Sequence, residues 1–427
     1  MAEATTLAQK IVARAAGREA VTPGEVVTAK VDLAMIHDSG GPRRVEPILQ
    51  ELGVGLFDKD KVVLISDHFV PGDTDEGARI LELTRQWARE KEVAFHDGQG
   101  ICHVVLPERG HLKPGMLVVG GDSHSTTGGA FGAYMFGIGA TEMAGVLATG
   151  EIWLSVPHTI LIEWQNRLSQ GVTAKDMMLA ICGRIGMDGG RYQAVEYAGE
   201  AIAALSMQER MTLSNMAAEL GGQAGLIAPD AVTADYLDKA GGDAGDWAHL
   251  KSDAGAELMA HHVMDAAALQ PQVAAPHSPA NAAPVGDVSD TSIDVAYIGA
   301  CTGAKYEDLK NAAAILAGQT VPSGVELLVA PASRRDQDRA EAEGLMAVFE
   351  EAGAKILPNA CGICAGYGTH RLGEDITCIS STARNFKGRM GAASSAVWLA
   401  SPFTVAASAI AGRITDPRDF LGSEVAP

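Results

Sequence analysis

Short hydrophobic runs that end in glycine or small polar residues recur along the chain. Strands that are buried on both faces of a parallel sheet are apolar throughout, without the alternation of a half-exposed strand. The sequence therefore predicts buried parallel strands in the runs KVVLIS (61–66), MLVVGGD (116–122), HTILIEW (158–164), DVAYIGA (294–300) and VELLVAPAS (325–333).

Helical spacing follows the first of these runs. Asp73 and Glu76 resemble a capping box, and Ile80 and Trp87 continue an apolar stripe to about Glu92. The N-terminal segment also has an amphipathic helical pattern and lacks the apolar core of a signal peptide. Strands that alternate with helices are typical of an α/β fold, and 427 residues are enough for two or three such domains.

Two stretches need separate interpretation. Residues 391–412 carry no charge, but Ser401 and Pro402 divide them, which predicts a buried strand and a helix rather than a membrane span. Residues 266–292 are rich in Ala and Pro, which predicts a linker before a C-terminal domain. The net charge of −20 disfavours binding to nucleic acid or to anionic membranes. We expect a cytoplasmic protein without either partner.

Aspartate and histidine follow two of the predicted strands. Asp67 and His68 come directly after KVVLIS, and Asp122 and His124 come after MLVVGG, with His103 between the two pairs. Ligands of open α/β sheets gather beyond the carboxyl ends of strands, and a carboxylate beside an imidazole suits proton transfer. The alternative for each pair is a capping Asp with a surface His.

Six cysteines in a chain without a secretory signal do not indicate a disulfide framework. The isolated Cys102, Cys182 and Cys378 are expected to be small buried apolar residues. The other three cysteines form a more informative pattern, described next.

Cys361 and Cys364 lie in NACGICAGYG, and Cys301 lies sixty residues upstream, after DVAYIGA. Three thiolates suit an iron–sulfur cluster that leaves one iron open to substrate. Glycines around the CxxC pair indicate a loop about a bulky group. Zinc, with His370 as the nearest further ligand, a redox dithiol and a purely structural role remain open alternatives.

The motifs together resemble the aconitase family along nearly the whole chain, in particular the large subunits of the 3-isopropylmalate dehydratase and homoaconitase type. The resemblance rests on SDHFVP, DGQGICHVVLPERGHLKPGMLVVGGDSHSTTGGAFGAYMFGIGATE, VEYAGEAIAALSMQERMTLSNMAAELGGQAGLIAPD, PHSPANAAPV, IGACTGAKYEDL, CGICAGYG and STARNFKGRMG. Because PHSPANAAPV is part of the family pattern, the linker is expected to be partly ordered.

The resemblance implies three α/β domains, at residues 1–158, 159–268 and 285–427, without the swivelling fourth domain of single-chain aconitases. A separate small subunit would carry that domain in a heterodimer or heterotetramer, and the active site would form at their interface. The implied activity is that of a [4Fe-4S] hydro-lyase, which removes water from a 2-hydroxy acid and adds it back with the hydroxyl on the neighbouring carbon.

The resemblance also assigns residues to roles. The cluster would be bound by Cys301, Cys361 and Cys364. The departing hydroxyl would be protonated by the carboxylate and imidazole groups of Asp67, His68, His103, Asp122 and His124. Substrate would be contacted by Ser123, with its carboxylates held by Arg384 and Arg389, and Glu196 would lie near the iron-bound water.

Four residues depart from the family pattern. Ala300 and Gly303 replace the serine and asparagine of GSCTNG, Ile363 replaces the proline of CGPC, and Ala383 replaces an asparagine. Lost amide donors would change the potential or exposure of a cluster. A 3-isopropylmalate dehydratase of leucine biosynthesis is the leading interpretation, and homoaconitase or a 2,3-dimethylmalate or 2-methylmalate dehydratase is the alternative. From other classes, an RNA-binding regulator or an inactive scaffold is also considered.

Overall fold

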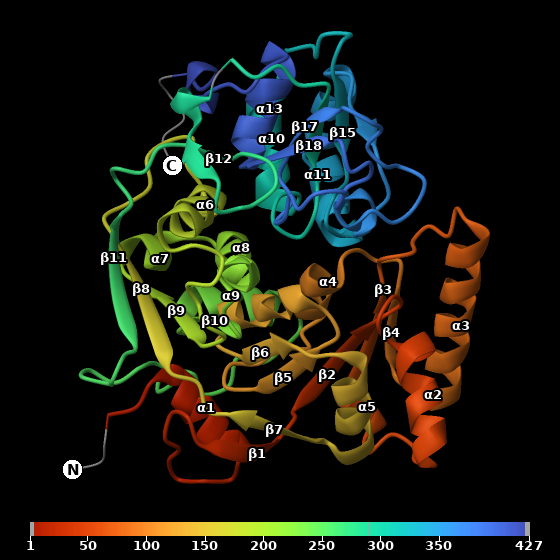
Figure 1. Ribbon diagram of the computed structural model, residues 1–427, viewed down its shortest axis with the longest axis vertical. Coiled ribbons are helices and arrows are strands. Elements are labelled where there is room, and N and C mark those ends of the chain that lie inside the picture. Colours follow the sequence, from red (N-terminus) through yellow and green to blue (C-terminus); the bar gives the residue numbers. More distant parts are fainter. Residues whose placement is uncertain (1–3, 289, 423–427) are drawn as a thin grey trace.

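The computed structural model describes residues 4–288 and 290–422, which form a mixed α/β fold (Figure 1). It contains sheets of five, four and seven strands and a two-stranded antiparallel sheet of β1 (Val26–Lys30) and β7 (Glu151–Ser155). Helix α1 (Leu7–Ala15) is buried except at Lys10 and Arg14, which share one face, in keeping with the amphipathic N-terminal pattern. No helix among the described residues is long and apolar enough to cross a membrane.

The first large sheet has the order β4-β3-β2-β5-β6, and all its neighbouring strands are parallel. Its strands are β2 (Leu33–His37), β3 (Val62–Ser66), β4 (Ala94–Asp97), β5 (Leu117–Gly120) and β6 (Tyr134–Gly137). The helices around it are α2 (Pro42–Leu52), α3 (Asp75–Lys91), α4 (Cys102–Glu108) and α5 (Ala140–Thr149). Both faces are buried, because Met35 packs into one hydrophobic cluster and its neighbour Ile36 into another.

The second sheet has the order β10-β9-β8-β11 and is parallel throughout. Its strands are β8 (Thr159–Gln165), β9 (Ala194–Ala198), β10 (Ala224–Ile227) and β11 (Ala260–Asp265). The helices of this part of the chain are α6 (Ala174–Ile185), α7 (Glu200–Ala204), α8 (Met207–Met216) and α9 (Ala231–Lys239). Helix α8 packs against the 3-10 helix η2 (Ser123–Phe131), which follows the first sheet's strand β5.

The third sheet has the order β13-β12-β18-β17-β14-β15-β16, with a parallel centre and antiparallel β12 and β13 at one edge. Its strands are β12 (Gln272–Ala274), β13 (Ala282–Pro284), β14 (Val295–Ile298), β15 (Glu326–Val329), β16 (Lys355–Ile356), β17 (Thr377–Ser380) and β18 (Ala396–Ala400). Its helices are α10 (Tyr306–Leu316), α11 (Arg334–Ala342), α12 (Leu345–Glu351) and α13 (Pro402–Ala411).

Several sequence predictions can be compared with these elements. The uncharged stretch forms β18 and α13, with Ser401 as the N-cap and Pro402 in the first turn, as predicted. The segment 266–292 is not simply a linker, because it supplies β12 and β13 to the third sheet. The predicted helix near residue 73 begins one residue later, since Thr74 rather than Asp73 accepts the capping hydrogen bond from the Gly77 amide.

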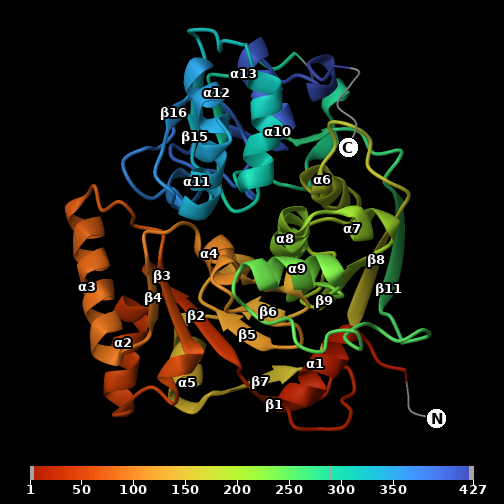
Figure 2. The ribbon, with the colours of Figure 1, turned by 180° about the vertical axis from the view of Figure 1, so that it is seen from behind.

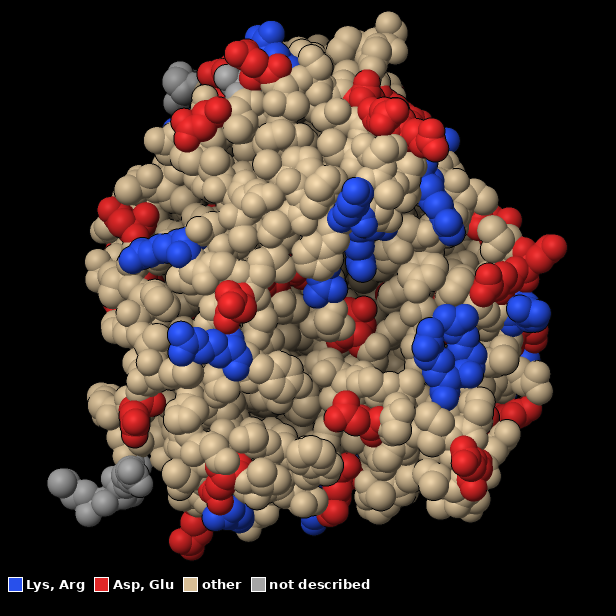
Figure 3. Space-filling model, viewed as in Figure 1, with Lys and Arg blue, Asp and Glu red and all other residues tan. Residues whose placement is uncertain are grey.

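The first and third sheets meet at the carboxyl ends of their strands. The Cys361 amide donates to the Asp67 carbonyl (2.9 Å), and the Ile101 amide donates to the Ala332 carbonyl (2.8 Å). In Figures 1 and 2 the C-terminal third of the chain lies above the first sheet, and α4 lies near the boundary between them. Figure 3 shows a hollow near the centre of this face, with acidic and basic side chains at its edge.

Candidate active site

One cavity at this boundary gathers most of the predicted site residues. Loops after β3, β5, β14 and β17 of the two sheets lead into it, together with α4 and the CxxC loop after β16. Because parallel strands end at the same edge of a sheet, residues far apart in sequence converge here. The residues that line the cavity are Asp67, His68, Ile101, His103, Asp122, His124, Ala300, Cys301, Cys361, Cys364, Ala383 and Arg389.

Asp67 and His68 form the first acid–imidazole pair. The Nδ1 of His68 lies 2.6 Å from Oδ1 of Asp67, and the Cys102 amide donates to the other oxygen of Asp67 (2.8 Å). Asp38, which the sequence analysis did not single out, accepts backbone hydrogen bonds from His68 and Phe69 and fixes this loop. Burial alone would lower the pKa of His68, but the charge and hydrogen bond of Asp67 raise it to about 9.

Asp122 joins two imidazoles. Its Oδ1 lies 2.9 Å from Nε2 of His103, and the backbone amide of His124 donates to the same oxygen (2.8 Å). Burial would favour the neutral acid, yet the hydrogen bonds and charges of the His103 and His124 side chains hold the pKa of Asp122 well below its usual range. Carboxylate contacts also raise the pKa of His124, against the effects of burial and of the nearby Arg384 charge. All three predicted histidines therefore have a carboxylate partner. The alternative of a capping Asp with a surface His does not describe them, because all three imidazoles are buried.

Glu219 completes the contacts of His124 and was not predicted. Its Oε1 lies 2.9 Å from Nε2 of His124 and accepts a hydrogen bond from Nε of Arg384 (2.7 Å). Glu219 is fully buried, and its hydrogen bonds to these groups lower its pKa although burial would raise it. The guanidinium of Arg384 also donates to Oγ of Ser123 (2.8 Å).

Glu196 does not lie in this cavity. It belongs to β9 of the second sheet, where its Oε2 accepts a hydrogen bond from Oγ of Ser252 (2.6 Å). The same Ser252 oxygen accepts from the amide of Leu7, at the start of α1, so Glu196 faces the N-terminal helix. The glutamate that contacts His124 is instead Glu219, which lies in the 3-10 helix that follows α8.

The three cysteines of the CxxC and GACTGA motifs line the cavity as free thiols. Burial, together with the nearby Cys364 thiolate, raises the pKa of Cys301 to about 12, whereas the hydrogen bond from Cys361 lowers the pKa of Cys364. The side-chain amide of Asn215 donates to the Cys301 sulfur (3.1 Å). By contrast, the isolated Cys102, Cys182 and Cys378 are fully buried, as predicted.

The arrangement of the sulfurs bears on the kind of metal that could bind. Ligands of one tetrahedral ion lie close together, because each bond is about 2.3 Å long for sulfur. Among the described residues, only two groups of three or more His, Cys, Asp or Glu ligand atoms lie within 4.8 Å of one another, and neither group includes a cysteine. Three spread thiols around one cavity fit a multi-iron cluster better than a single zinc ion.

Two buried lysines hold the loop that carries Cys301 and the neighbouring loop after β17. Nζ of Lys305 donates to the Cys301 carbonyl (3.1 Å) and pairs with Asp308 (2.6 Å). Nζ of Lys175 donates to the carbonyls of Ser381 and Thr382, on the loop after β17, and burial lowers its pKa to about 8. Two buried cations beside thiols stabilise the deprotonated form that a metal requires.

One departure from the family pattern, Gly303, has a structural counterpart. Gly303 has no room for a side chain, because a Cβ there would lie 2.2 Å from Cβ of Ser381. The Ser381 hydroxyl instead accepts from the Gly299 amide (2.9 Å) and lies within hydrogen-bond distance of the Gly303 carbonyl (3.3 Å). The Ser381 side chain, on the loop after β17, therefore occupies the space that a side chain at position 303 would enter. Nothing in the structure explains Ile363 or Ala383, which are simply buried.

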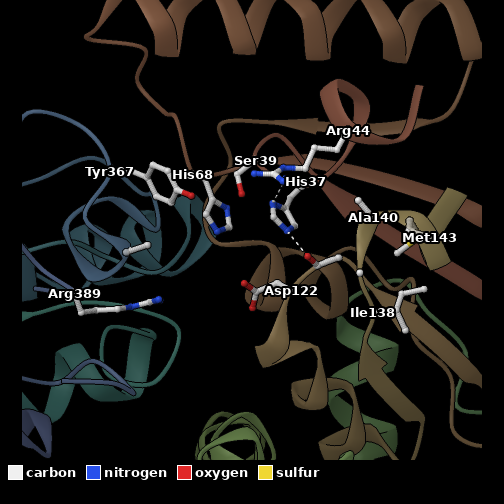
Figure 4. A pocket seen from close by; sticks show the side chains of 14 residues that line it. His37, Ser39, Arg44, His68, Asp122, Ile138, Ala140, Met143, Tyr367 and Arg389 are labelled. Atoms are coloured by element: carbon white, nitrogen blue, oxygen red, sulfur yellow. Dashed lines mark hydrogen bonds between the residues drawn. The ribbon is translucent and has the colours of Figure 1, made fainter. Parts of the chain in front are cut away.

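An adjoining pocket, with a volume of about 320 Å³, is lined in part by His68, Asp122 and Arg389, which also line the cysteine cavity (Figure 4). His37 stacks on His68 with 4.4 Å between ring centroids, and its Nε2 lies 3.0 Å from the Gly121 carbonyl. Arg389 is anchored by a hydrogen bond from its Nε to the Cys364 carbonyl (3.0 Å).

Comparison with known proteins agrees with this geometry. The sequence profile of the Aconitase family (aconitate hydratase) matches residues 9–291 and 286–412. The chain is 45% identical to 3-isopropylmalate dehydratase large subunit 1 of Methanopyrus kandleri over 419 residues, which cover 97% of this chain and 99% of that protein. It is 43% identical to a probable 3-isopropylmalate dehydratase large subunit of Methanothermobacter thermautotrophicus, covering 96% and 98% of the two chains.

A relative that is named for a different substrate is nearly as similar. The chain is 41% identical to a probable methanogen homoaconitase large subunit of Methanothermobacter thermautotrophicus, with 98% of each chain covered. The chain belongs to the aconitase family. It is an aconitase-family hydro-lyase, and nearly all of its length corresponds to chains named large subunits.

Proposed function

We propose that this chain is the large, catalytic subunit of a [4Fe-4S] hydro-lyase that interconverts 2-isopropylmalate and 3-isopropylmalate. The observation that carries the proposal is the shared cavity, in which three free thiols lie beside three imidazoles that each contact a carboxylate. Cys301, Cys361 and Cys364 would bind the cluster. When bound, the cluster would supply a Lewis acid for the hydroxyl group that leaves.

The protein's own groups supply the proton for this hydroxyl. A hydroxide ion is a poor leaving group, so it must leave as water, with a proton from a neighbouring acid. His68 is suited to this role, because its pKa of about 9 keeps the imidazole protonated at neutral pH and its Nδ1 is already bound to Asp67. Asp122 holds the imidazole of His103 and the backbone of His124 in fixed positions.

The arginines would hold the substrate. Arg384 is fixed by Glu219 and Ser123, and Arg389 by the Cys364 carbonyl, so both guanidinium groups have restricted orientations. A planar guanidinium that is already oriented binds a carboxylate with little further loss of entropy. We infer that the base that removes the proton from the neighbouring carbon belongs to a separate small subunit. The names of the relatives, which are large subunits, support the existence of such a partner.

The experiment is turnover by the complex with the small subunit, after anaerobic assembly of the cluster. Formation of 3-isopropylmalate from 2-isopropylmalate is followed, with homoaconitate, 2-methylmalate and 2,3-dimethylmalate as competing substrates. Conversion of the isopropyl acid with the highest kcat/KM supports the proposal. Turnover of homoaconitate alone would establish the second candidate, which the homoaconitase relative favours. Absence of turnover with every acid would overturn both.

A further inference from the structure

The pocket beside the cysteine cavity has an unusual distribution of charge. Three of its lining residues, His68, Asp122 and Arg389, also line the cavity. Figure 4 shows that Arg44 extends into the pocket. Asp122 is the only carboxylate in its lining, and the hydrogen bonds of that group go to His103 and His124. Arg44 therefore contributes a cation to a pocket whose one acid already has partners.

Arg44 differs from its neighbour Arg43 in its contacts. Nε of Arg43 donates to the Ser39 carbonyl (2.9 Å), and its guanidinium lies over the ring of Phe69, 5.3 Å from the centroid. Arg44 is exposed, and it forms no ion pair or side-chain hydrogen bond with the residues that the structure describes. Arg43 thus has a structural role, whereas the guanidinium of Arg44 is free to bind a ligand.

The wall of the pocket beside Arg44 is apolar. Ile138, which follows β6, and Ala140 and Met143, in the first turn of α5, lie on the same side of the pocket as Arg44 in Figure 4, across from Tyr367 and Arg389. The N-terminus of α5 also places its positive dipole end here. The pocket therefore offers an apolar surface and a cation to whatever part of the substrate enters it.

The pocket is continuous with the place of reaction. His68 is 5% exposed, its Nδ1 is bound to Asp67, and its Nε2 forms no hydrogen bond within the described part of the chain. A substrate whose hydroxyl lies beside this imidazole can extend its non-reacting substituent into the pocket, because His68 lines both spaces. A volume of about 320 Å³ exceeds what a branched three-carbon group needs.

We propose that Arg44 is a specificity-determining residue that binds a carboxylate at the tip of the substrate's non-reacting substituent. The inference rests on the proposed function, because it assumes that the shared cavity holds a 2-hydroxy acid. The complex accordingly accepts acids whose substituent ends in a carboxylate, in addition to acids with a branched alkyl substituent that contacts Ile138 and Met143.

The test measures binding rather than turnover. Two unreactive acids that differ only in the substituent, butane-1,2,4-tricarboxylate and isopropylsuccinate, are titrated calorimetrically into the anaerobic complex of both subunits. A charge-assisted hydrogen bond contributes enough for a tenfold to hundredfold change in affinity. Arg44→Met is therefore expected to weaken tricarboxylate binding, relative to isopropylsuccinate, by about tenfold or more, and Arg44→Lys by less. Arg79→Met removes an equal charge from α3, outside the pocket lining, and should leave the ratio of dissociation constants unchanged.

Either of two results with the variants would overturn the inference alone: an unchanged ratio of dissociation constants in Arg44→Met, or an equal change in Arg79→Met, which would indicate only the general field of the protein. Failure of the wild-type complex to bind the tricarboxylate, while it binds isopropylsuccinate, would also overturn it. Failure to bind either acid, together with no turnover of any hydroxy acid, would overturn the proposed function as well.

Discussion

The Asp67–His68 pair gives the sharpest prediction about the chemistry of this site. Asp67→Asn keeps the shape of the side chain but removes the charge that holds the imidazole protonated. With a pKa of about 9, roughly 97% of His68 is protonated at pH 7.5. In the variant, burial lowers the pKa of this imidazole while the charges of Asp38 and Asp122 raise it, so His68 should titrate well below 9, toward its ordinary value of 6.5.

The expected magnitude follows from these two values. At pH 7.5 an imidazole with a pKa of 6.5 is about 10% protonated, so loss of the proton donor alone should lower kcat roughly tenfold. The basic limb of the pH–rate profile should move from near pH 9 to near pH 6.5. Activity in the variant should therefore recover partly as the pH is lowered, which a simple structural defect would not produce.

The assay is NMR titration of the protein labelled with ¹³C in the histidine rings, with the His68 signal assigned by His68→Gln. The pH–rate profile of the complex is measured in parallel. Asp60→Asn, at an exposed position of a 3-10 helix, is the matched control and should leave both measurements unchanged. A His68 signal that still titrates near pH 9 in Asp67→Asn would refute the assignment of its charge to Asp67.

Three further predictions address other parts of the account. Gly303→Ala should lower the free energy of unfolding by about 2 kcal/mol or more, because its Cβ would lie 2.2 Å from Cβ of Ser381; Gly324→Ala, which meets no atom within 4 Å, is the control in thermal unfolding, and equal losses would contradict the packing argument. Glu219→Gln should lower kcat/KM by about tenfold or more, because it loses charged hydrogen bonds to His124 and Arg384. Glu196→Gln should change kcat/KM by less than about threefold. A larger loss of kcat/KM in Glu196→Gln than in Glu219→Gln would support the role that the family resemblance assigns to Glu196. The free energy of unfolding of the wild-type protein relative to His68→Gln should be largest below about pH 6.5 and fall by roughly 3 kcal/mol as the pH rises through 9, because folding raises the pKa of His68; a pH-independent difference in chemical denaturation would exclude that contribution.

The sequence predicts most of this site because buried parallel strands have a simple signature. KVVLIS and DVAYIGA form β3 and β14, and the residues after them lie at the boundary of the two sheets. The near-continuous apolar character of these runs reflects burial on both faces, as the two clusters that contact β2 illustrate. Fold class and strand-end chemistry are therefore local properties that the sequence records.

Contacts between segments that are distant in the sequence leave no such local pattern of residues. The capping prediction for Asp73 fails because the Thr369 hydroxyl, 296 residues away, donates to its carboxylate. Glu196 matches a motif, but its strand directs it toward Ser252 and α1. The sequence indicates a role for Glu219 only weakly. Glu219 and Asn215 are polar residues four positions apart in the apolar run LSNMAAEL, and in a helix this spacing places both on one face. Only the packing of α8 against η2 reveals that this face borders the cavity.

The central claim is that Cys301, Cys361 and Cys364 bind an iron–sulfur cluster in this chain. It is tested most directly by the iron and acid-labile sulfide content of anaerobically purified protein, with Cys361→Ser as the comparison and Cys378→Ser, in the fully buried β17, as the control. We predict about four iron and four sulfide per wild-type chain, retained in Cys378→Ser and lost in Cys361→Ser. Zinc in place of iron, or equal iron in all three proteins, would contradict the account.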